Sequence, residues 1–386
     1  MKRVINIEDA RERAYKQLPK FIFDFLDGGA EDEVTLHDNR RSFSTIKFNP
    51  RVLVDVSERD MSTTILGEPV KLPLMLAPAG GARLLCRDGE IAAARAAGHE
   101  GTIFSLSTAS NFNIEEVSEA APGPLWFQLY SLGSREDTAS LVERAQKAGY
   151  KALCVCVDFT APGKRERDLR NRASLPPQLT WNKALHILRR PLWLRHYLFG
   201  PPISLGNLEG LSSYRGLSRK EVLMSHKKKV PTSTALRWED LKWIREMWTG
   251  PLVIKGIMNA DDAKRVLDYG VNGIVVSNHG GRQLDGSPSS IEVLPEVVAS
   301  VAGHAEVFID SGIRRGTDVV KAIALGAQAC LIGRPYLFGL AIGGETGVIQ
   351  VLKILRDEID RTMALIGCRK LADLNHTAIR LRQAGY

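Results

Sequence analysis

The segment Gly273–Asp285 reads GIVVSNHGGRQLD and joins a strand signal to a cluster of reactive side chains. Gly273–Val276 is a short apolar run without polar alternation, which is typical of a strand buried on both faces of a parallel sheet. The run opens into a glycine-containing turn that carries His279 and Arg282. Histidine suits proton transfer near neutral pH, and the arginine fork fits a carboxylate. Ordinary solvated loops also contain His-x-x-Arg. The rest of the chain must therefore decide whether this turn is a functional site or such a loop.

Similar runs recur along the chain and predict further buried strands. They are Leu74–Ala77, Thr102–Ser107, Leu125–Tyr130, Ala152–Asp158, Leu252–Lys255, Gly273–Ser277, Glu306–Asp310 and Cys330–Gly333. Amphipathic segments that predict helices separate most of them, namely Gly89–Gly98, Arg135–Ala148, Trp238–Trp248, Asp261–Tyr269 and Asp318–Leu325. Strands and helices in this alternation predict a (β/α)8 TIM barrel, with an N-terminal helical segment before it. A doubly wound sheet is the main alternative, but no central crevice motif supports it. We expect residues 1–386 to form a single barrel domain.

Polar and charged residues gather where these runs end. They are Ser107, Gln128, Tyr130, Asp158, Lys255, Ser277, His279, Asp310, Gly333 and Arg334. In a parallel barrel the carboxyl ends of all strands meet at one mouth, where active sites are built. Their recurrence at strand ends therefore predicts a single functional site.

The last two strands carry a phosphate signal. Asp310–Gly316 reads DSGIRRG, and Gly333-Arg334-Pro335 follows the final run. Glycine turns expose N–H groups, while Arg314 and Arg334 supply charge for phosphate oxygens. Lys255 is the last residue of the predicted strand Leu252–Lys255. Burying its charge costs free energy unless an anion lies nearby. It could form a Schiff base, or it could balance an anionic cofactor ring.

Composition limits the class of protein. The chain has 386 residues, a formal net charge of +8 and a pI of about 9.2, so anionic partners are favoured without being identified. Five cysteines without a Cys-x-x-Cys pair read as reduced core thiols of a cytoplasmic protein, and the pattern predicts no metal site. The charged N-terminus does not read as a secretion signal, and no run has the length of a spanning helix.

One interval breaks the alternation of strands and helices. We expect residues 169–230 to be an insertion after the fourth barrel strand. Within it, residues 185–199 read LHILRRPLWLRHYLF, and Glu209 is the only acidic residue between Leu169 and Lys220. Basic residues mixed with Trp and Leu indicate a segment lying on an anionic membrane surface. A lid or a subunit interface is the alternative, whereas no nucleic-acid module is present.

Together these motifs resemble the FMN-dependent 2-hydroxy-acid dehydrogenases and oxidases. The resemblance extends from Leu18 to Cys368 and rests on Ser277–Asp285, Asp310–Gly316 and Trp126–Tyr130. Shorter stretches are most similar to the membrane-associated (S)-mandelate dehydrogenases. They are Leu106–Asn111, Arg165–Leu169, Gly343–Val348 and Asp357–Thr362.

The resemblance implies roles for individual residues. His279 would be the base, oriented by Asp158, with Tyr130 near the substrate hydroxyl. Arg282 would clamp the substrate carboxylate with Arg165 nearby, and Lys255 would stabilise the reduced flavin. The residues that would line the FMN ring and ribityl chain are Ala79, Gly80, Ser107, Gln128, Cys156 and Ser277, and those that would hold its phosphate end are Asp310, Gly312, Arg314, Gly333 and Arg334.

The resemblance also implies the reaction and its partners. An (S)-2-hydroxy acid would become the 2-oxo acid, with electrons passing to a membrane quinone or another acceptor. The segment 185–199 would hold a homotetrameric enzyme against the inner face of the cell membrane. An oxygen-using oxidase is one alternative, and a flavin-binding barrel with a changed substrate is another.

Three departures from the family pattern bear on the substrate. Phe25 stands where the family usually has a tyrosine that would bind the substrate carboxylate. Cys156 replaces a frequent threonine, so one flavin contact would be weakened or replaced. Gly80 and Gly81 stand where bulkier residues are common. We therefore expect room for an aromatic or bulky substrate side chain.

Overall fold

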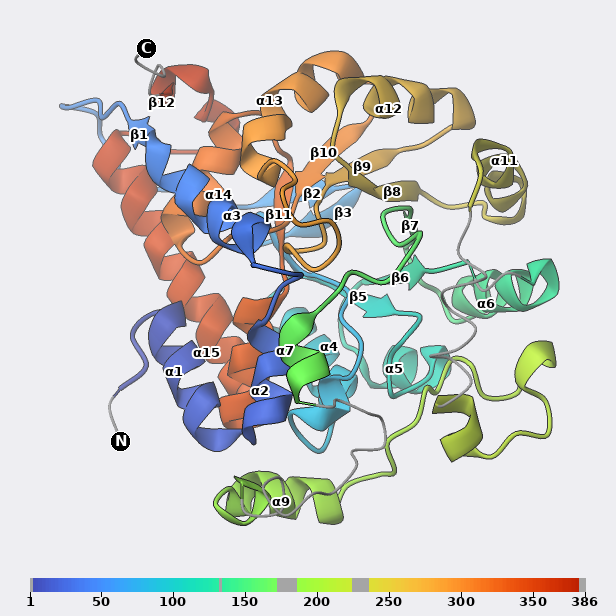
Figure 1. Cartoon of the computed structure of the whole chain (residues 1–386). Helices are drawn as coiled ribbons and strands as arrows, with labels where there is room; N and C mark the ends of the chain where they lie inside the picture. Colours follow the sequence, from blue (N-terminus) through green and yellow to red (C-terminus); the bar gives the residue numbers. More distant parts are fainter. Residues whose placement is uncertain (1–2, 132–133, 172–185, 224–235, 382–386) are drawn as a thin grey trace.

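The computed structural model describes residues 3–131, 134–171, 186–223 and 236–381. Its centre is a closed barrel in the order β10-β11-β4-β5-β6-β7-β8-β9, in which every pair of neighbours is parallel (Figure 1). The strands are β4 (Leu74–Leu76), β5 (Ile103–Ser107), β6 (Leu125–Leu129), β7 (Ala152–Cys156), β8 (Leu252–Ile257), β9 (Gly273–Val276), β10 (Glu306–Ile309) and β11 (Ala329–Ile332). The predicted barrel is confirmed, and the doubly wound alternative is excluded.

The predicted strand ends differ from the observed ones by one or two residues. Tyr130, Asp158 and Asp310 lie just after their strands, because the chain turns away at the barrel mouth. The exception is β8, which continues past Lys255 to Ile257. Its register shifts between these two residues, and Gly256 adopts a φ of 109° that a side chain would disfavour.

The barrel interior changes from apolar to polar along each strand. Its apolar layer includes Trp126, Cys154, Val253, Val275 and Phe308, and the rings of Trp126 and Phe308 meet edge to face at 5.4 Å. Side chains on a strand return to the same face every second residue. The inward positions two residues later are therefore those of Gln128, Cys156, Lys255, Ser277 and Asp310. This periodicity places the polar set together above a packed apolar floor.

Helices surround the barrel and close its N-terminal side. The described helices are α1 (Ile7–Gln17), α2 (Lys20–Asp27), α3 (Val34–Thr45), α4 (Gly89–His99), α5 (Ile114–Ala120), α6 (Arg135–Lys147), α7 (Glu166–Arg170), α9 (Pro191–Leu198), α11 (Trp238–Met247), α12 (Ala260–Arg265), α13 (Ser290–Val301), α14 (Gly316–Ala324) and α15 (Arg334–Ile366). The hairpin β2–β3 (Thr63–Ile65 and Glu68–Val70) adds Ile65 and Val70 to the apolar floor. The strands β1 (Ile46–Phe48) and β12 (Ile379–Leu381) pair antiparallel, so the C-terminal strand lies beside the segment that follows α3 (Figure 1).

The long helix α15 is apolar and long enough to cross a membrane by length and composition. Its backbone leaves the helical conformation at Gly343 and Gly344, where two helices meet at a kink. Val348, Leu355 and Met363 on its second half are fully buried in the hydrophobic core. Packing inside the protein therefore accounts for its apolar character.

The inserted segment is only partly described. Residues 172–185 and 224–235, which include part of the predicted 169–230 insertion, lie outside the described residues. Within the described part, the Trp193 ring of α9 is buried and its indole N–H donates to Leu84 O at 2.7 Å. This contact fixes α9 beside the loop that follows β4.

Candidate active site

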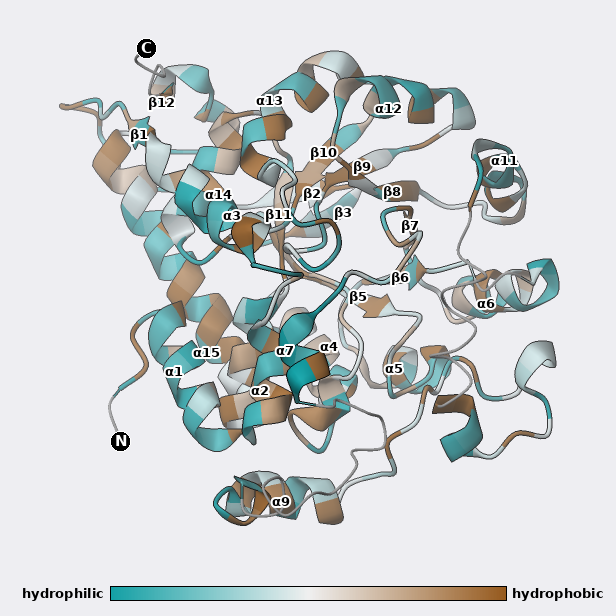
Figure 2. Cartoon of the chain, in the orientation of Figure 1, coloured by the Kyte–Doolittle hydropathy of each residue, from teal (hydrophilic) through white to brown (hydrophobic). Residues whose placement is uncertain are grey.

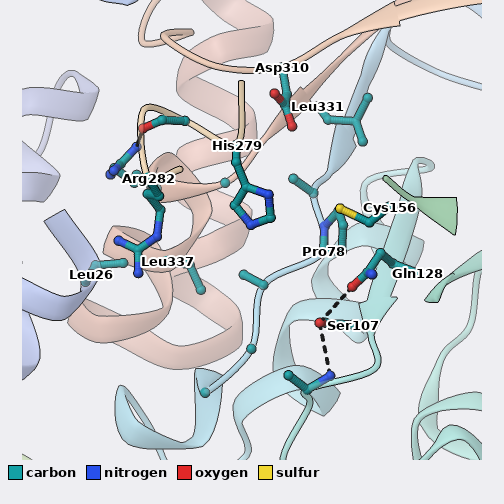
Figure 3. Close-up of a pocket in the computed structure, with 18 of the residues that line it drawn as sticks. Leu26, Pro78, Ser107, Gln128, Cys156, His279, Arg282, Asp310, Leu331 and Leu337 are labelled. Atoms are coloured by element: carbon teal, nitrogen blue, oxygen red, sulfur yellow. Dashed lines mark hydrogen bonds between the residues drawn. The ribbon is translucent and has the colours of Figure 1, made fainter. Parts of the chain in front are cut away.

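A cavity of about 370 Å³ opens at the carboxyl ends of the barrel strands. Figure 3 shows His279, Gln128 and Asp310 around it, with Arg282 and Leu26 on one side and Cys156 on the other. Loops after β4, β5, β6, β9, β10 and β11 all contribute to its wall. This is the single mouth predicted from the polar strand ends.

His279 is held between an acid and a phenol. Its Nδ1 lies 3.1 Å from both carboxylate oxygens of Asp158, and its Nε2 lies 3.4 Å from Tyr130 Oη. Burial alone would favour the neutral carboxyl, but His279 and Lys255 hold the pKa of Asp158 well below its usual range. Asp158 is therefore a carboxylate that fixes the ring and favours a positive charge on it. Nε2 faces the cavity as the atom able to accept a proton.

Cys156 joins this group. Its thiol donates to Asp158 Oδ1 at 2.8 Å, and burial raises the pKa of the thiol. Thiol, carboxylate and imidazole atoms lie within 4.8 Å of one another, close enough for a metal ion. Hydrogen bonds among the three groups already account for this approach.

Lys255 is fully paired inside the barrel. Its Nζ lies 2.8 Å from Asp310 Oδ2 and donates to Ser277 Oγ at 2.6 Å. Burial opposes the charge, but Asp310 and Asp158 more than offset it and raise the pKa of Lys255. A lysine held as an ammonium cannot act as an amine nucleophile, so this geometry contradicts the Schiff-base alternative and agrees with a cation beside a cofactor ring.

Two arginines flank the ring of Phe25. The guanidinium of Arg282 lies 5.3 Å from the ring centre, and that of Arg165 lies 6.0 Å away. Arg282 Nη1 donates to Phe25 O at 2.9 Å and to Gly28 O at 2.8 Å, which fixes its orientation. Burial, with Arg165 and Arg334 nearby, lowers the pKa of Arg282. A bound anion would relieve this cost, so the geometry suits a carboxylate.

A further part of the cavity has the character of a phosphate site. Burial, reinforced by the neighbouring Arg334, lowers the pKa of Arg314 to about 9, and burial lowers that of Arg334 to about 10. Gln128 Nε2, Arg314 Nε and Arg334 Nε are buried and have no hydrogen-bond partner among the described residues. Buried donors without partners are rare in native proteins. Cationic and orphaned donors lining one cavity fit a cofactor with a phosphate and a polar ring.

The structure brings nearly all the predicted residues together. The cavity wall contains Phe25, Ala79, Gly80, Ser107, Gln128, Tyr130, Cys156, Arg165, Lys255, His279, Arg282, Asp310, Gly312, Arg314, Gly333 and Arg334. Asp158 and Ser277 lie behind it, bonded to His279 and Lys255. Ser107 Oγ donates to Gln128 Oε1 at 3.0 Å and accepts from Ala109 N (Figure 3).

Some lining residues were not predicted. Phe159 directly follows Asp158, and its ring lies 5.2 Å from that of Tyr130, so its position in the sequence was a usable signal. Leu337 lies one helical turn after Arg334, which was also readable. Leu205 and Leu223 come from the insertion, where no pattern indicated that they would reach the cavity.

Fold and site together define a barrel enzyme with a base, a carboxylate-binding arginine and a site for a phosphorylated ring cofactor. Residues 14–381 match the family model described as FMN-dependent dehydrogenase. The chain belongs to this family, its cofactor is FMN, and it is an oxidoreductase acting on the CH–OH group of 2-hydroxy acids.

Individual relatives cover almost the whole chain. An L-lactate oxidase of Nostoc sp. is 44% identical over 381 residues, which is 98% of this chain and 98% of the relative. The 2-hydroxyacid oxidase 1 of Homo sapiens is 43% identical and covers 98% of this chain and 97% of its own. A crystal structure of the monotopic membrane protein (S)-mandelate dehydrogenase superposes with a TM-score of 0.93 at 41% identity, covering 98% of this chain and 100% of that one.

Proposed function

We propose that the enzyme oxidises an (S)-2-hydroxy acid with a bulky or aromatic side chain and passes the electrons to a membrane quinone. The observation that carries the proposal is His279 Nε2 facing the cavity with Asp158 behind it and Arg282 beside it. FMN supplies the two-electron acceptor when bound. His279 takes the substrate proton, Asp158 stabilises the resulting imidazolium, and Tyr130 binds the substrate hydroxyl.

The other charged residues orient substrate and cofactor. Arg282 holds the carboxylate, with Arg165 as a second cation close to the Phe25 ring. Lys255 is placed to favour negative charge on the reduced flavin ring. When FMN is bound, Gln128 would donate a hydrogen bond to its ring, and Arg314 and Arg334 would hold its phosphate. These assignments use the buried donors that lack partners in the protein itself.

The wall around the base favours a large substrate side chain. Leu84, Leu205 and Leu223 line the cavity together with Phe159. At Gly81, an added Cβ would come within 3.4 Å of Leu84 Cδ1 and 3.6 Å of Phe25 Cε1, so the missing side chain keeps this space open. An apolar wall gains free energy from covering large aliphatic or aromatic groups, whereas lactate offers only a methyl group and glycolate has no side chain.

The exposed face of α9 and the chain next to it supports membrane contact. Leu188, Leu192, Leu198 and Phe199 are more than half exposed, at 68%, 59%, 62% and 73%. Figure 2 shows α9 at the edge of the molecule, with apolar residues interleaved with polar ones. Arg189 and Arg195 lie among them, as expected for a helix at an anionic membrane surface. The (S)-mandelate dehydrogenase relative is described as a monotopic membrane protein. We place this enzyme on the inner face of the cell membrane, as a homotetramer.

The experiment is anaerobic titration of the yellow protein with both enantiomers of 2-hydroxy acids, from lactate to mandelate and larger analogues. Bleaching of the flavin band by one enantiomer supports the reaction, and the tightest substrate identifies the side chain. If only lactate or glycolate bleaches it, the bulky-substrate assignment is wrong.

The second candidate is an oxygen-using oxidase, which the names of the lactate and 2-hydroxyacid oxidase relatives favour. Oxygen consumption during turnover, measured with an electrode and compared with the rate of short-chain quinone reduction, separates the two acceptors.

Membrane contact has its own test. Replacing Leu188, Leu192, Leu198 and Phe199 with serine should release the protein from anionic vesicles, while dye-linked activity remains. The matched control replaces four residues exposed elsewhere, Ile5, Val52, Leu53 and Leu365. Equal release by both variants would contradict a role for α9.

A further inference from the structure

A second cavity, of about 380 Å³, lies between α9, the start of α4, the end of α1 and the kink of α15. Its wall includes Trp193 and Leu192 from α9 and Leu340 and Gly344 from α15. We call this cavity the α9–α15 groove. No residue assigned above to hydroxy-acid oxidation or to FMN lies in it.

The groove combines an apolar wall with hydrogen-bonding groups. Trp193, whose ring stacks on that of Tyr197, forms part of the apolar wall. Arg95 and His196 line the groove as donors and form no ion pair among the described residues. Gln17 Oε1 is a buried acceptor in the same wall, without a hydrogen-bond partner in the described part of the chain. A planar ring could pack against the apolar wall. Its oxygens would accept hydrogen bonds from Arg95 and His196 in the oxidised form, and in the reduced form one of them would donate to Gln17 Oε1.

The charges along the groove favour a neutral occupant. Asp88 and Glu345 also line it, facing Arg87 at 3.9 Å and His99 at 3.5 Å. Arg87 and Arg95 also line the groove, so its positive and negative charges nearly cancel and give a phospholipid phosphate no net attraction. An uncharged quinone head group does not depend on such an attraction.

The groove lies close to both the flavin cavity and the membrane-facing helix. Leu85 lines the flavin cavity and the groove together. On α15, Leu337 lines the flavin cavity and Leu340 lines the groove. These two residues are three positions, or about 4.5 Å, apart along the helix axis. Leu192 lines the groove and is also exposed on α9. An occupant would therefore sit one side-chain layer from the flavin cavity, with an apolar route from the lipid.

We propose that the α9–α15 groove binds the head group of the lipid-soluble quinone that accepts the electrons. This inference rests on the proposed function. The quinone takes two electrons from the reduced cofactor and two protons, one from the reduced cofactor and one from solvent in the open groove, while His279 releases to solvent the proton that it took from the substrate. It leaves as the quinol, and oxidised FMN is restored. Arg95 and His196 donate to the quinone oxygens, and Gln17 Oε1 accepts from the quinol.

The test uses the holoenzyme and a short-chain ubiquinone. Ala341→Trp should fill the groove, and Arg95→Ala should remove a donor. The matched controls are Ala305→Trp, in a separate surface cavity, and Arg41→Ala, an exposed arginine on α3. Three quantities are measured: anaerobic bleaching by the hydroxy acid, reoxidation by a soluble dye, and reoxidation by the quinone. Equilibrium dialysis of the quinone gives binding independently of turnover.

Both groove variants should weaken quinone binding and slow quinone reoxidation at least tenfold, with bleaching and dye reoxidation unchanged. The controls should leave all four measurements unchanged. Quinone binding and reoxidation that survive in both groove variants would overturn the inference while leaving hydroxy-acid oxidation intact. Binding to anionic vesicles is measured in the same variants; if they lose only this binding, the groove is a lipid site and the inference is wrong. Absent bleaching in the unaltered protein would instead mean that the proposed function has failed.

Discussion

Restoring a hydroxyl at Phe25 tests the assignment of the carboxylate site. The ring centre lies 5.3 Å from the guanidinium of Arg282 and 6.0 Å from that of Arg165, and the ring lines the cavity beside Gly81. In Phe25→Tyr the new hydroxyl would donate one hydrogen bond to the substrate carboxylate. A hydrogen bond to a charged group contributes about 1.5–3 kcal/mol, which corresponds to roughly 10- to 150-fold tighter binding. The carboxylate does not react, so KM should fall while kcat remains nearly constant.

The assay is stopped-flow bleaching of the flavin by the preferred 2-hydroxy acid without oxygen. Its concentration dependence gives the dissociation constant, and its plateau gives the rate of reduction. Phe48→Tyr is the matched control, since that ring lies 5.4 Å from the ammonium of Lys321, away from the cavity. An unchanged dissociation constant in Phe25→Tyr would refute the placement of the carboxylate between the two arginines. A lower dissociation constant in both Phe25→Tyr and Phe48→Tyr would mean that the tighter binding does not come from a hydroxyl at position 25.

Three further predictions concern the base, the buried pair and a buried acid. His279→Ala should retain bound FMN by its visible spectrum but slow reduction by about 10²- to 10⁴-fold; undiminished reduction would exclude His279 as the base. In the protein stripped of FMN, Lys255→Met should lower the free energy of unfolding in urea by about 3–5 kcal/mol, because Asp310 is left as a buried charge without its partner. The double variant Lys255→Met/Asp310→Asn should recover most of this loss. No recovery would contradict the pairing. Burial raises the pKa of Glu90 to about 7, so between pH 4.5 and 7 the folded state binds a proton that the unfolded state has lost. The free energy of unfolding should therefore fall by about 3 kcal/mol as the pH rises from 4.5 to 7. Glu90→Gln should remove this pH dependence in denaturant unfolding, and an unchanged pH dependence would assign it to another group.

The fold was readable because buried parallel strands and their helices leave strong local patterns. The polar strand ends also located the mouth, since a parallel barrel gathers all carboxyl ends on one side. The roles assigned to Tyr130 and Arg165 came from resemblance to a family. Their positions beside His279 and Phe25 depend on loop conformation, which leaves no periodic signal.

Other features could not be read because they depend on long-range contacts. The sequence left two alternatives for Lys255, and only its approach to Asp310 across the barrel decides between them. Leu205 and Leu223 reach the cavity from the insertion through tertiary packing. The α9–α15 groove likewise forms where segments distant in sequence meet, so no single stretch could have indicated it.

The carbonyl of Gly28 accepts hydrogen bonds from both Arg282 and Arg334, each at 2.8 Å. The arginine assigned to the substrate and the one assigned to the phosphate are thus oriented by a loop near the start of the chain. These contacts join residues 254 and 306 positions apart, so neither can form until most of the chain has been synthesised. During synthesis, a chain that has not yet reached β11 lacks Arg334 and the last barrel strand, so its active site is incomplete. Premature cofactor capture by a nascent, half-built barrel is therefore disfavoured by the order in which the sequence emerges.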